Sequence, residues 1–133
     1  MPYVLDASIA ACWCFHDEQD ARADIAFELL DRDSAVVPAH WWFEVRNITL
    51  VGERRGRVSQ TDASLFLGRL ERLAITHADL PDGNAVLELA RRRRLSFYDA
   101  AYLELAQRES IALATLDNDL CVAARAEGVA LIE

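Results

Sequence analysis

The stretch Tyr3-Val4-Leu5-Asp6-Ala7-Ser8 decides the fold of this chain. Its first residues predict a short buried strand, because a continuous apolar run that ends in small polar residues suits a strand covered on both faces. In open parallel sheets, ligands bind just beyond the carboxyl ends of the strands. The strand therefore delivers the carboxyl group of Asp6 to the edge where a site is expected. The alternative is that Asp6 or Ser8 only caps the helix that follows.

The composition predicts one folded domain, residues 1–133, without a membrane segment. The chain is long enough to bury a core, and 53% of its residues are apolar. No apolar run approaches the roughly 20 residues that span a bilayer, and no basic region leads into a long apolar segment. We expect a cytoplasmic protein, in which Cys12, Cys14 and Cys121 are buried structural thiols.

The charge pattern excludes several function classes. The net charge of −8 argues against nonspecific adhesion to nucleic acid, which normally requires a basic surface. All 14 basic residues are arginines, so the chain lacks the lysine of Walker-type phosphate loops and of Schiff-base enzymes. The five glycines are scattered, which excludes a dinucleotide-binding fingerprint.

Strand-like and helix-like segments alternate along the chain, as in proteins with right-handed crossovers between parallel strands. The sequence therefore predicts an α/β fold, a three-layer α/β/α sandwich around a mostly parallel sheet of four to five strands. We expect strands at 3–5, 34–38, 73–77, 111–115 and 129–132, and helices at 9–15, 21–30, 41–55, 60–70, 81–94, 97–108 and 117–128.

Further acids follow these elements, and each has an alternative explanation. Glu44 lies in the most aromatic run of the chain, where a charge is costly unless it pairs with Arg46, reaches solvent or binds a cation. Asp99 stands three residues after Ser96, the spacing of a capping box. Asp117 follows a predicted strand and could cap the next helix. Asp119, two residues on, could favour the dipole of that helix.

Together the acids indicate a metal site. Asp6 and Asp117 emerge at the carboxyl ends of two strands, and Glu44 and Asp99 lie near the starts of helices, so all four are expected at one edge of the sheet. Carboxylates that crowd together raise one another's pKa values, and a divalent cation removes that penalty. Oxygen ligands without a histidine or thiol cluster favour Mg²⁺ or Mn²⁺ over Zn²⁺. An EF-hand is excluded, because the required glycine and closing glutamate are absent.

Four blocks give the chain a resemblance to PIN-domain ribonucleases, and within them to the VapC toxins of bacterial toxin–antitoxin pairs. The blocks are Val4-Leu5-Asp6-Ala7-Ser8, Val37-Pro38 with Glu44-Val45-Arg46-Asn47, Ser96-Phe97-Tyr98-Asp99-Ala100-Ala101-Tyr102, and Leu113-Ala114-Thr115-Leu116-Asp117. They occur in the family's order and span nearly the whole chain. The resemblance implies metal-coordinating acids at Asp6, Glu44, Asp99 and Asp117, with Ser8, Asn47, Thr115 and Asp119 as supporting polar groups.

The same resemblance implies a toxin that hydrolyses RNA phosphodiester bonds, blocks translation, forms a homodimer and is neutralised by an antitoxin protein. Bound metal would lower the pKa of a water, orient it and neutralise phosphate oxygens. Asp6 and Asp99 are expected as principal ligands. Glu44 and Asp117 would ligate through water or accept the proton of the nucleophile. The arginine runs 91–94 and 54–57 either bind backbone phosphates or form solvated helix ends.

Three other functions are open from the sequence. A haloacid-dehalogenase-type phosphatase also begins with an acid after its first strand, but it requires a lysine and a second Asp where Ser8 stands. A housekeeping nuclease would use the same site without an antitoxin. A non-catalytic acidic module would keep the fold without metal. His16, His40 and His77 lie on separate segments and are interpreted as surface or core residues.

Overall fold

The central strand is β1 (Tyr3–Leu5), and all three of its residues are buried. The computed structural model describes residues 1–133, and its single sheet has the order β3-β2-β1-β4 with every neighbouring pair parallel. The other strands are β2 (Ala35–Val37), β3 (Ile75–His77) and β4 (Ala112–Ala114). The chain builds outward from β1 to β3 and then returns to the far side of β1. A topological switch point therefore lies between β1 and β4.

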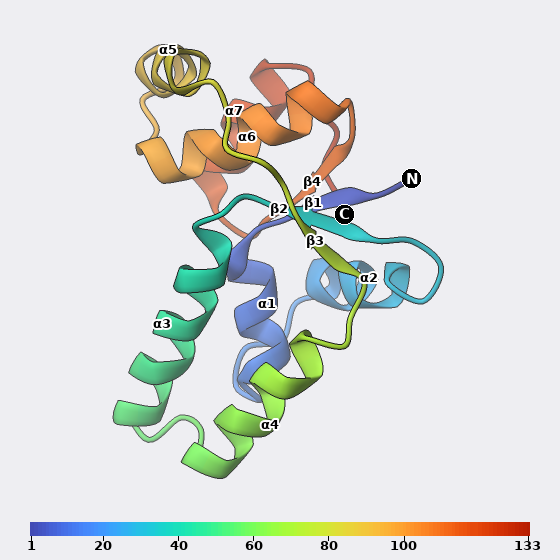
Figure 1. The fold of residues 1–133 in the computed structure, drawn as a ribbon, viewed down its shortest axis with the longest axis vertical. Coiled ribbons are helices and arrows are strands. Elements are labelled where there is room, and N and C mark those ends of the chain that lie inside the picture. The colour runs from blue at the N-terminus through green and yellow to red at the C-terminus, as the bar shows by residue number, and fades with distance from the viewer.

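Seven helices cover the sheet in two layers. They are α1 (Ala7–Cys14), α2 (Ala21–Leu29), α3 (Trp41–Arg54), α4 (Gln60–Leu70), α5 (Gly83–Arg93), α6 (Phe97–Glu109) and α7 (Asn118–Ala126). Helices α5, α6 and α7 lie on one face of the sheet, and α1 to α4 lie on the other (Figure 1). The expected α/β/α sandwich is confirmed. None of the helices has both the length and the apolar character needed to span a bilayer.

Several helices begin where the sequence places a capping side chain. The hydroxyl of Ser59 accepts from the Asp62 N–H, and that of Ser96 accepts from the Asp99 N–H, both at 3.1 Å. Such side-chain acceptors satisfy amides that have no partner inside the helix. Asp6 occupies the N-cap position of α1, but its side chain makes no capping hydrogen bond. Its carboxylate is therefore available for another role.

The expected fifth strand at 129–132 is reduced to one bridge, in which Leu131 pairs with Leu113 of β4 in parallel. The N–H of Leu113 donates to the Ala130 carbonyl at 2.9 Å, and the N–H of Ile132 donates to the Leu113 carbonyl at 3.0 Å. Both bonds involve Leu113, so the pairing does not extend along β4. The sheet has four strands, within the predicted range.

The contact between α1 and α3 depends on a glycine. Gly52 is buried in α3, and a Cβ atom built on it would lie 2.3 Å from the ring of the buried Phe15. The guanidinium of Arg57 lies over that ring, 4.0 Å from its centroid. Because the ring is enclosed, it has little room to move away.

We expect Gly52→Ala to lower the free energy of unfolding by about 1–2 kcal/mol, because overpacking outweighs the higher helix propensity of alanine. The measurement is urea unfolding followed by circular dichroism. Gly68 in α4 is the matched control, since nothing lies within 4 Å of a Cβ atom there. Gly68→Ala should raise stability by about 0.5–1 kcal/mol. Equal effects of the two substitutions would contradict this account of the α1–α3 contact.

Candidate active site

Asp6 lies at the carboxyl end of β1, and its N–H donates to the Ala114 carbonyl of β4 at 3.0 Å. The residue is 6% exposed. Its Oδ2 accepts two hydrogen bonds, from the Thr115 hydroxyl at 2.6 Å and from the Ser8 hydroxyl at 2.7 Å. A buried carboxylate is costly unless donors stabilise it. The two hydroxyls supply those donors without neutralising the charge.

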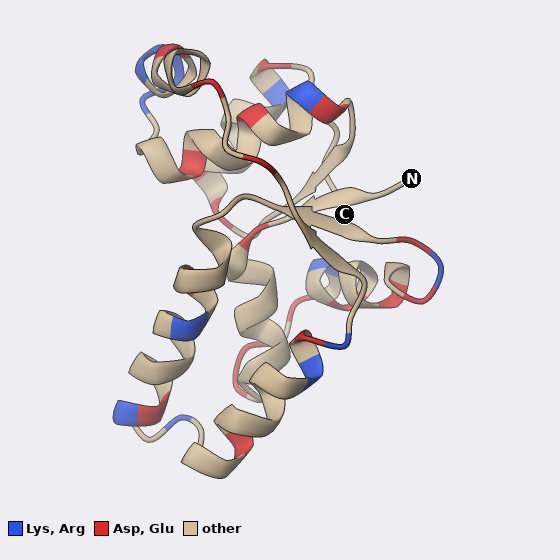
Figure 2. Cartoon of the chain, in the orientation of Figure 1, with Lys and Arg blue, Asp and Glu red and all other residues tan.

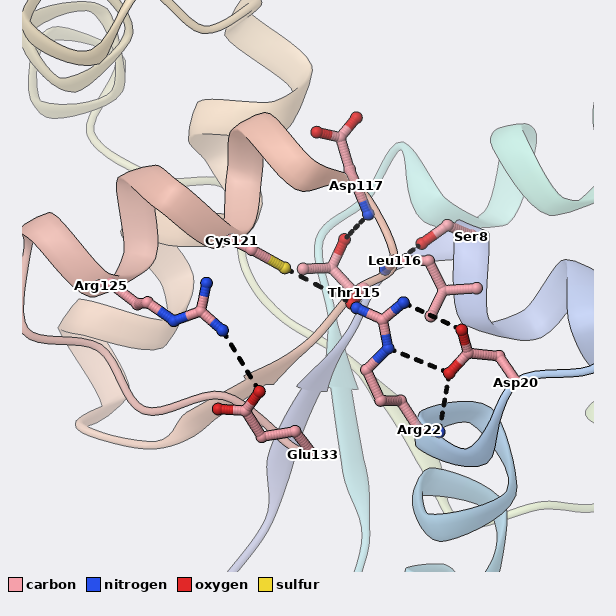
Figure 3. Close-up of polar contacts among 9 residues, drawn as sticks. All are labelled: Ser8, Asp20, Arg22, Thr115, Leu116, Asp117, Cys121, Arg125 and Glu133. Atoms are coloured by element: carbon pink, nitrogen blue, oxygen red, sulfur yellow. Dashed lines mark hydrogen bonds and ion pairs between the residues drawn. The ribbon is translucent and has the colours of Figure 1, made fainter.

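The same hydroxyls fix the connection from β4 to α7 (Figure 3). The Ser8 oxygen accepts from the Leu116 N–H at 3.0 Å, and the Thr115 oxygen accepts from the Asp117 N–H at 3.1 Å. Asp117 is the N-cap of α7, where its Oδ1 accepts from the Leu120 N–H at 3.0 Å. Asp6 and Asp117 are therefore linked through Thr115.

Glu44 lies in the first turn of α3 and is held from α6. The hydroxyl of Tyr102 donates to its Oε1 at 2.6 Å. Burial raises the pKa of Tyr102, so the phenol stays protonated and acts as a donor. The Nε2 atom of His40, at the N-cap of α3, lies 3.4 Å from the same oxygen. The alternative pairing of Glu44 with Arg46 is not found, and Arg46 lies 3.7 Å from Glu71.

The pKa values of three of the acids are raised, first by burial and then by neighbouring acids. Burial is the main cause that raises the pKa of Asp6, and the charge of Glu44 adds to it. Burial likewise raises the pKa of Glu44, with a contribution from Asp99. The pKa of Asp99 is raised by burial, then by Asp117 and Asp6. Asp6, Glu44 and Asp99 thus each feel the charge of another acid, and a shared site at the sheet edge stays a prediction.

Two of the supporting residues lie further out. Asn47 is exposed on α3, one turn after Glu44. Asp119 is exposed in the first turn of α7 and lines a cavity of about 450 Å³ together with Arg92, Arg93 and Arg94. None of the other predicted site residues lines this cavity.

Sequence reasoning missed His40 and Tyr102. The ring centroids of these residues are 4.8 Å apart, and both side chains contact Glu44. Burial lowers the pKa of His40, while the nearby Asp6 and Asp99 oppose that shift. The sequence spacing could have identified both residues as neighbours of the acids. His40 stands four residues before Glu44, and Tyr102 stands three residues after Asp99, so each pair shares a helical face.

The donor set fits a hydrated cation better than a closed cage. No three Asp, Glu, His or Cys side chains are close enough together to ligate one ion. Mg²⁺ commonly retains several waters and takes only one or two protein carboxylates. The crowded carboxylates at residues 6, 44 and 99, whose pKa values are raised, supply oxygen donors of the kind Mg²⁺ and Mn²⁺ prefer. The cysteines form no disulfide; Cys14 and Cys121 are buried as expected, whereas Cys12 is only partly buried and that expectation is wrong for it.

These features define a parallel α/β protein with a carboxylate site at its topological switch point. The description PIN domain matches residues 3–126, which is most of the chain. The chain therefore belongs to the PIN-domain family, and the resemblance noted in its sequence is confirmed. Among the curated proteins there is no match.

Solved structures of the same fold include toxins. PAE2754 from Pyrobaculum aerophilum is 25% identical, with a TM-score of 0.74 over 99% of this chain and 92% of that one. VapBC2 from Rickettsia felis, bound to a DNA fragment from its promoter, is 16% identical, with a TM-score of 0.67 over 98% and 97%. VapC20 from Mycobacterium tuberculosis, a sarcin–ricin loop cleaving toxin, is 17% identical, with a TM-score of 0.60 over 91% and 94%.

We expect Asp6→Asn to stabilise the protein at neutral pH in EDTA. Asparagine keeps an oxygen for the Thr115 and Ser8 hydroxyls and removes the buried charge. The folded-state pKa of Asp6 is raised, so the folded protein binds its proton more tightly than the unfolded chain does. The free energy of unfolding therefore falls as the pH rises from about 4, the unfolded pKa, through the folded value.

The measurement is the melting temperature of both proteins between pH 4 and pH 8, two values chosen to lie at and well above the ordinary carboxyl pKa of about 4. The advantage of the variant should be largest at the upper end and shrink toward the lower end. Asp31→Asn, at an exposed acid after α2, is the control and should change stability by less than about 0.5 kcal/mol. A melting temperature of Asp6→Asn below that of the wild type at pH 8 would contradict the predicted charge crowding.

Proposed function

We propose that this chain is a divalent-metal-dependent endoribonuclease. The observation that supports the proposal is that the charges of neighbouring acids raise the pKa values of Asp6, Glu44 and Asp99 in a chain of the PIN-domain family, with Asp117 among the charges that act on Asp99. Mg²⁺, or Mn²⁺ in its place, would be held principally by Asp6 and Asp99. An acidic site receives a polyanion once a cation occupies it.

Some of the site residues would bind the cation, and others would accept a proton. A bound divalent ion supplies Lewis acidity and a water of lowered pKa. The hydroxyls of Ser8 and Thr115 orient Asp6 and oppose the rise in its pKa that burial causes. Tyr102 orients Glu44, so that this carboxylate acts through water or accepts the proton of the attacking water. Asp117 has the same two roles open to it, and Asn47 supports the site from the next turn of α3.

The purified protein should cleave RNA in Mg²⁺ and lose this activity in EDTA. Asp6→Asn and Asp99→Asn should each lower the rate at least about a thousandfold, because several kcal/mol of transition-state stabilisation depend on the ion. The measurement is the appearance of RNA fragments on a denaturing gel, with phosphate release assayed in parallel. Release of inorganic phosphate without chain cleavage would indicate a phosphatase instead.

Two controls keep the result interpretable. Asp31→Asn removes an exposed carboxylate after α2 and should cleave at the wild-type rate. Mg²⁺ alone should raise the melting temperature of the wild type and leave that of Asp6→Asn nearly unchanged, since ligands that bind only the folded state stabilise it. Absence of both cleavage and a Mg²⁺ shift would favour a non-catalytic acidic module.

We further propose that the enzyme is a VapC-type toxin that blocks translation in the cytoplasm, forms a homodimer and is neutralised by an antitoxin. The support is the family together with neighbours that are toxins or toxin–antitoxin complexes. A housekeeping nuclease of the same family is the second candidate. The two differ in whether a partner protein inhibits the chain.

An apolar cavity offers a place for that partner. Its volume is about 340 Å³, and it lies among α1, α2 and α4, with an edge-to-face ring contact of 5.2 Å between Trp13 and Phe27 at one side. Phe27 is exposed. Arg69 and Arg72 line the cavity as well. An amphipathic segment with acidic residues would match this lining.

We expect Phe27→Glu to weaken inhibition by the product of the neighbouring upstream gene about thirtyfold, because a central aromatic contact typically contributes at least 2 kcal/mol. RNA cleavage by this variant should be unchanged. The measurement is cleavage against inhibitor concentration, with growth of cells expressing both genes as a second readout. A wild-type chain that neither slows growth nor is inhibited by that product would favour the housekeeping nuclease.

A further inference from the structure

The exposed aromatic side chains are concentrated in two places. Five aromatic residues are exposed: Phe27, Trp42, Phe43, Phe97 and Tyr98. Four of them lie in the first turns of α3 and α6, the turns that also carry Glu44 and Asp99. Phe43 is 69% exposed and Tyr98 is 61% exposed. Large aromatic surface left in water next to a charged site indicates a binding surface.

The rings are neighbours of the acids in sequence, and Tyr98 is also linked to Glu44 in space. Phe43 immediately precedes Glu44, and Tyr98 immediately precedes Asp99. The ring centroid of Tyr98 is 5.4 Å from that of His40, whose Nε2 lies 3.4 Å from a Glu44 oxygen. Tyr98, His40 and Glu44 therefore form a continuous chain of contacts between α6 and α3.

Trp42 differs from its neighbours, because its face is already occupied. The guanidinium of Arg46 lies over the Trp42 ring, 3.9 Å from the centroid, and Arg46 also donates to the Trp42 carbonyl at 3.0 Å. Phe43 touches only the edge of this pair, with ring centroids 4.9 Å apart at an angle of 73°. Phe43 and Tyr98 are thus the most exposed of the aromatic side chains, and no cation lies over either ring.

An unpaired cation lies on the same segment as Tyr98. Arg92 and Arg93 form ion pairs with Glu127, at 3.0 Å and 2.6 Å. Arg94 is exposed and forms no ion pair, and it takes a left-handed backbone conformation, with φ of 55°, that favours glycine. Figure 2 shows basic residues in blue on α5 and on the stretch that leads from it toward α6.

We propose that Phe43 and Tyr98 are stacking surfaces for unpaired bases of the RNA substrate and that Arg94 binds its backbone phosphate. Exposed aromatic rings and arginine side chains are the groups that bind single strands. Bases in a duplex hide their faces, so the substrate class is single-stranded or loop RNA. The proposal rests on the proposed ribonuclease function. A self-association surface fits less well, because the rings alternate with carboxylates and a guanidinium.

The test measures binding in the Asp6→Asn background, which prevents cleavage. The probe is a short single-stranded RNA that carries a fluorescent aminopurine base, whose emission falls on stacking. Tyr98→Ala and Phe43→Ala should each weaken binding at least about fivefold and restore emission. Tyr98→Phe should bind normally, whereas Tyr98→Leu should not. Leu65→Ala removes an exposed apolar side chain of α4, is the control and should bind normally.

Arg94→Gly separates a binding role from a structural one. Glycine relieves the left-handed conformation, so this variant should melt at a higher temperature than its parent. It should nevertheless bind the RNA more weakly and lower the slope of log affinity against log salt by about 0.7. Arg32→Gln removes an exposed arginine near the amino end of β2 and should leave the slope unchanged. Unchanged affinity in Arg94→Gly overturns the assignment of Arg94.

The outcomes distinguish this proposal from the ribonuclease proposal. Normal cleavage by the wild type with RNA affinity unaffected by Tyr98→Ala and Phe43→Ala overturns the stacking surface alone. Ring-dependent binding without cleavage supports the stacking surface and removes the ribonuclease. Equal affinity for duplex RNA also overturns the proposal. A loss of dimer mass by light scattering in Tyr98→Ala, without loss of RNA affinity, identifies the rings as a subunit interface and overturns it too.

Discussion

The structure depends on one buried carboxylate, that of Asp6. It ends the central strand, and its oxygen accepts from hydroxyls that belong to α1 and to the segment after β4. A charge at this depth is tolerated only with such donors, and losing either would leave it poorly compensated. The same Ser8 and Thr115 oxygens accept backbone amides of the β4–α7 connection. The central strand, the first helix and the return of the chain are therefore fixed around a single charged group.

Different groups hold the other acids in position. Asp117 is anchored through backbone amides, whereas Glu44 is anchored by the phenol of Tyr102. None of these contacts neutralises a carboxylate, and the pKa values of Asp6, Glu44 and Asp99 remain raised. The fold thus concentrates negative charge at its switch point at a cost in stability. Such a local conflict is expected where a site serves function rather than folding.

Much of the architecture follows from local rules. The apolar run of β1, the Ser96 cap and the order of helices and strands were predicted, because periodicity and capping depend on residues close in sequence. The segment 129–132 was predicted as a strand and forms only a bridge, since pairing depends on a partner edge that local pattern does not describe. The acids at 6, 44, 99 and 117 were identified because parallel strands end at one edge.

The sequence by itself determined the element order, the fold class and which carboxylates are candidates for a shared site. The tertiary structure alone decided what surrounds them. Thr115 reaches Asp6 across 109 residues of chain, and Tyr102 reaches Glu44 across 58. The tertiary structure also placed Asp119 at a cavity that Arg92, Arg93 and Arg94 line. How the layers pack decides which side chains from distant segments meet. The spacing of two residues along the chain does not indicate how far apart they lie in the folded structure.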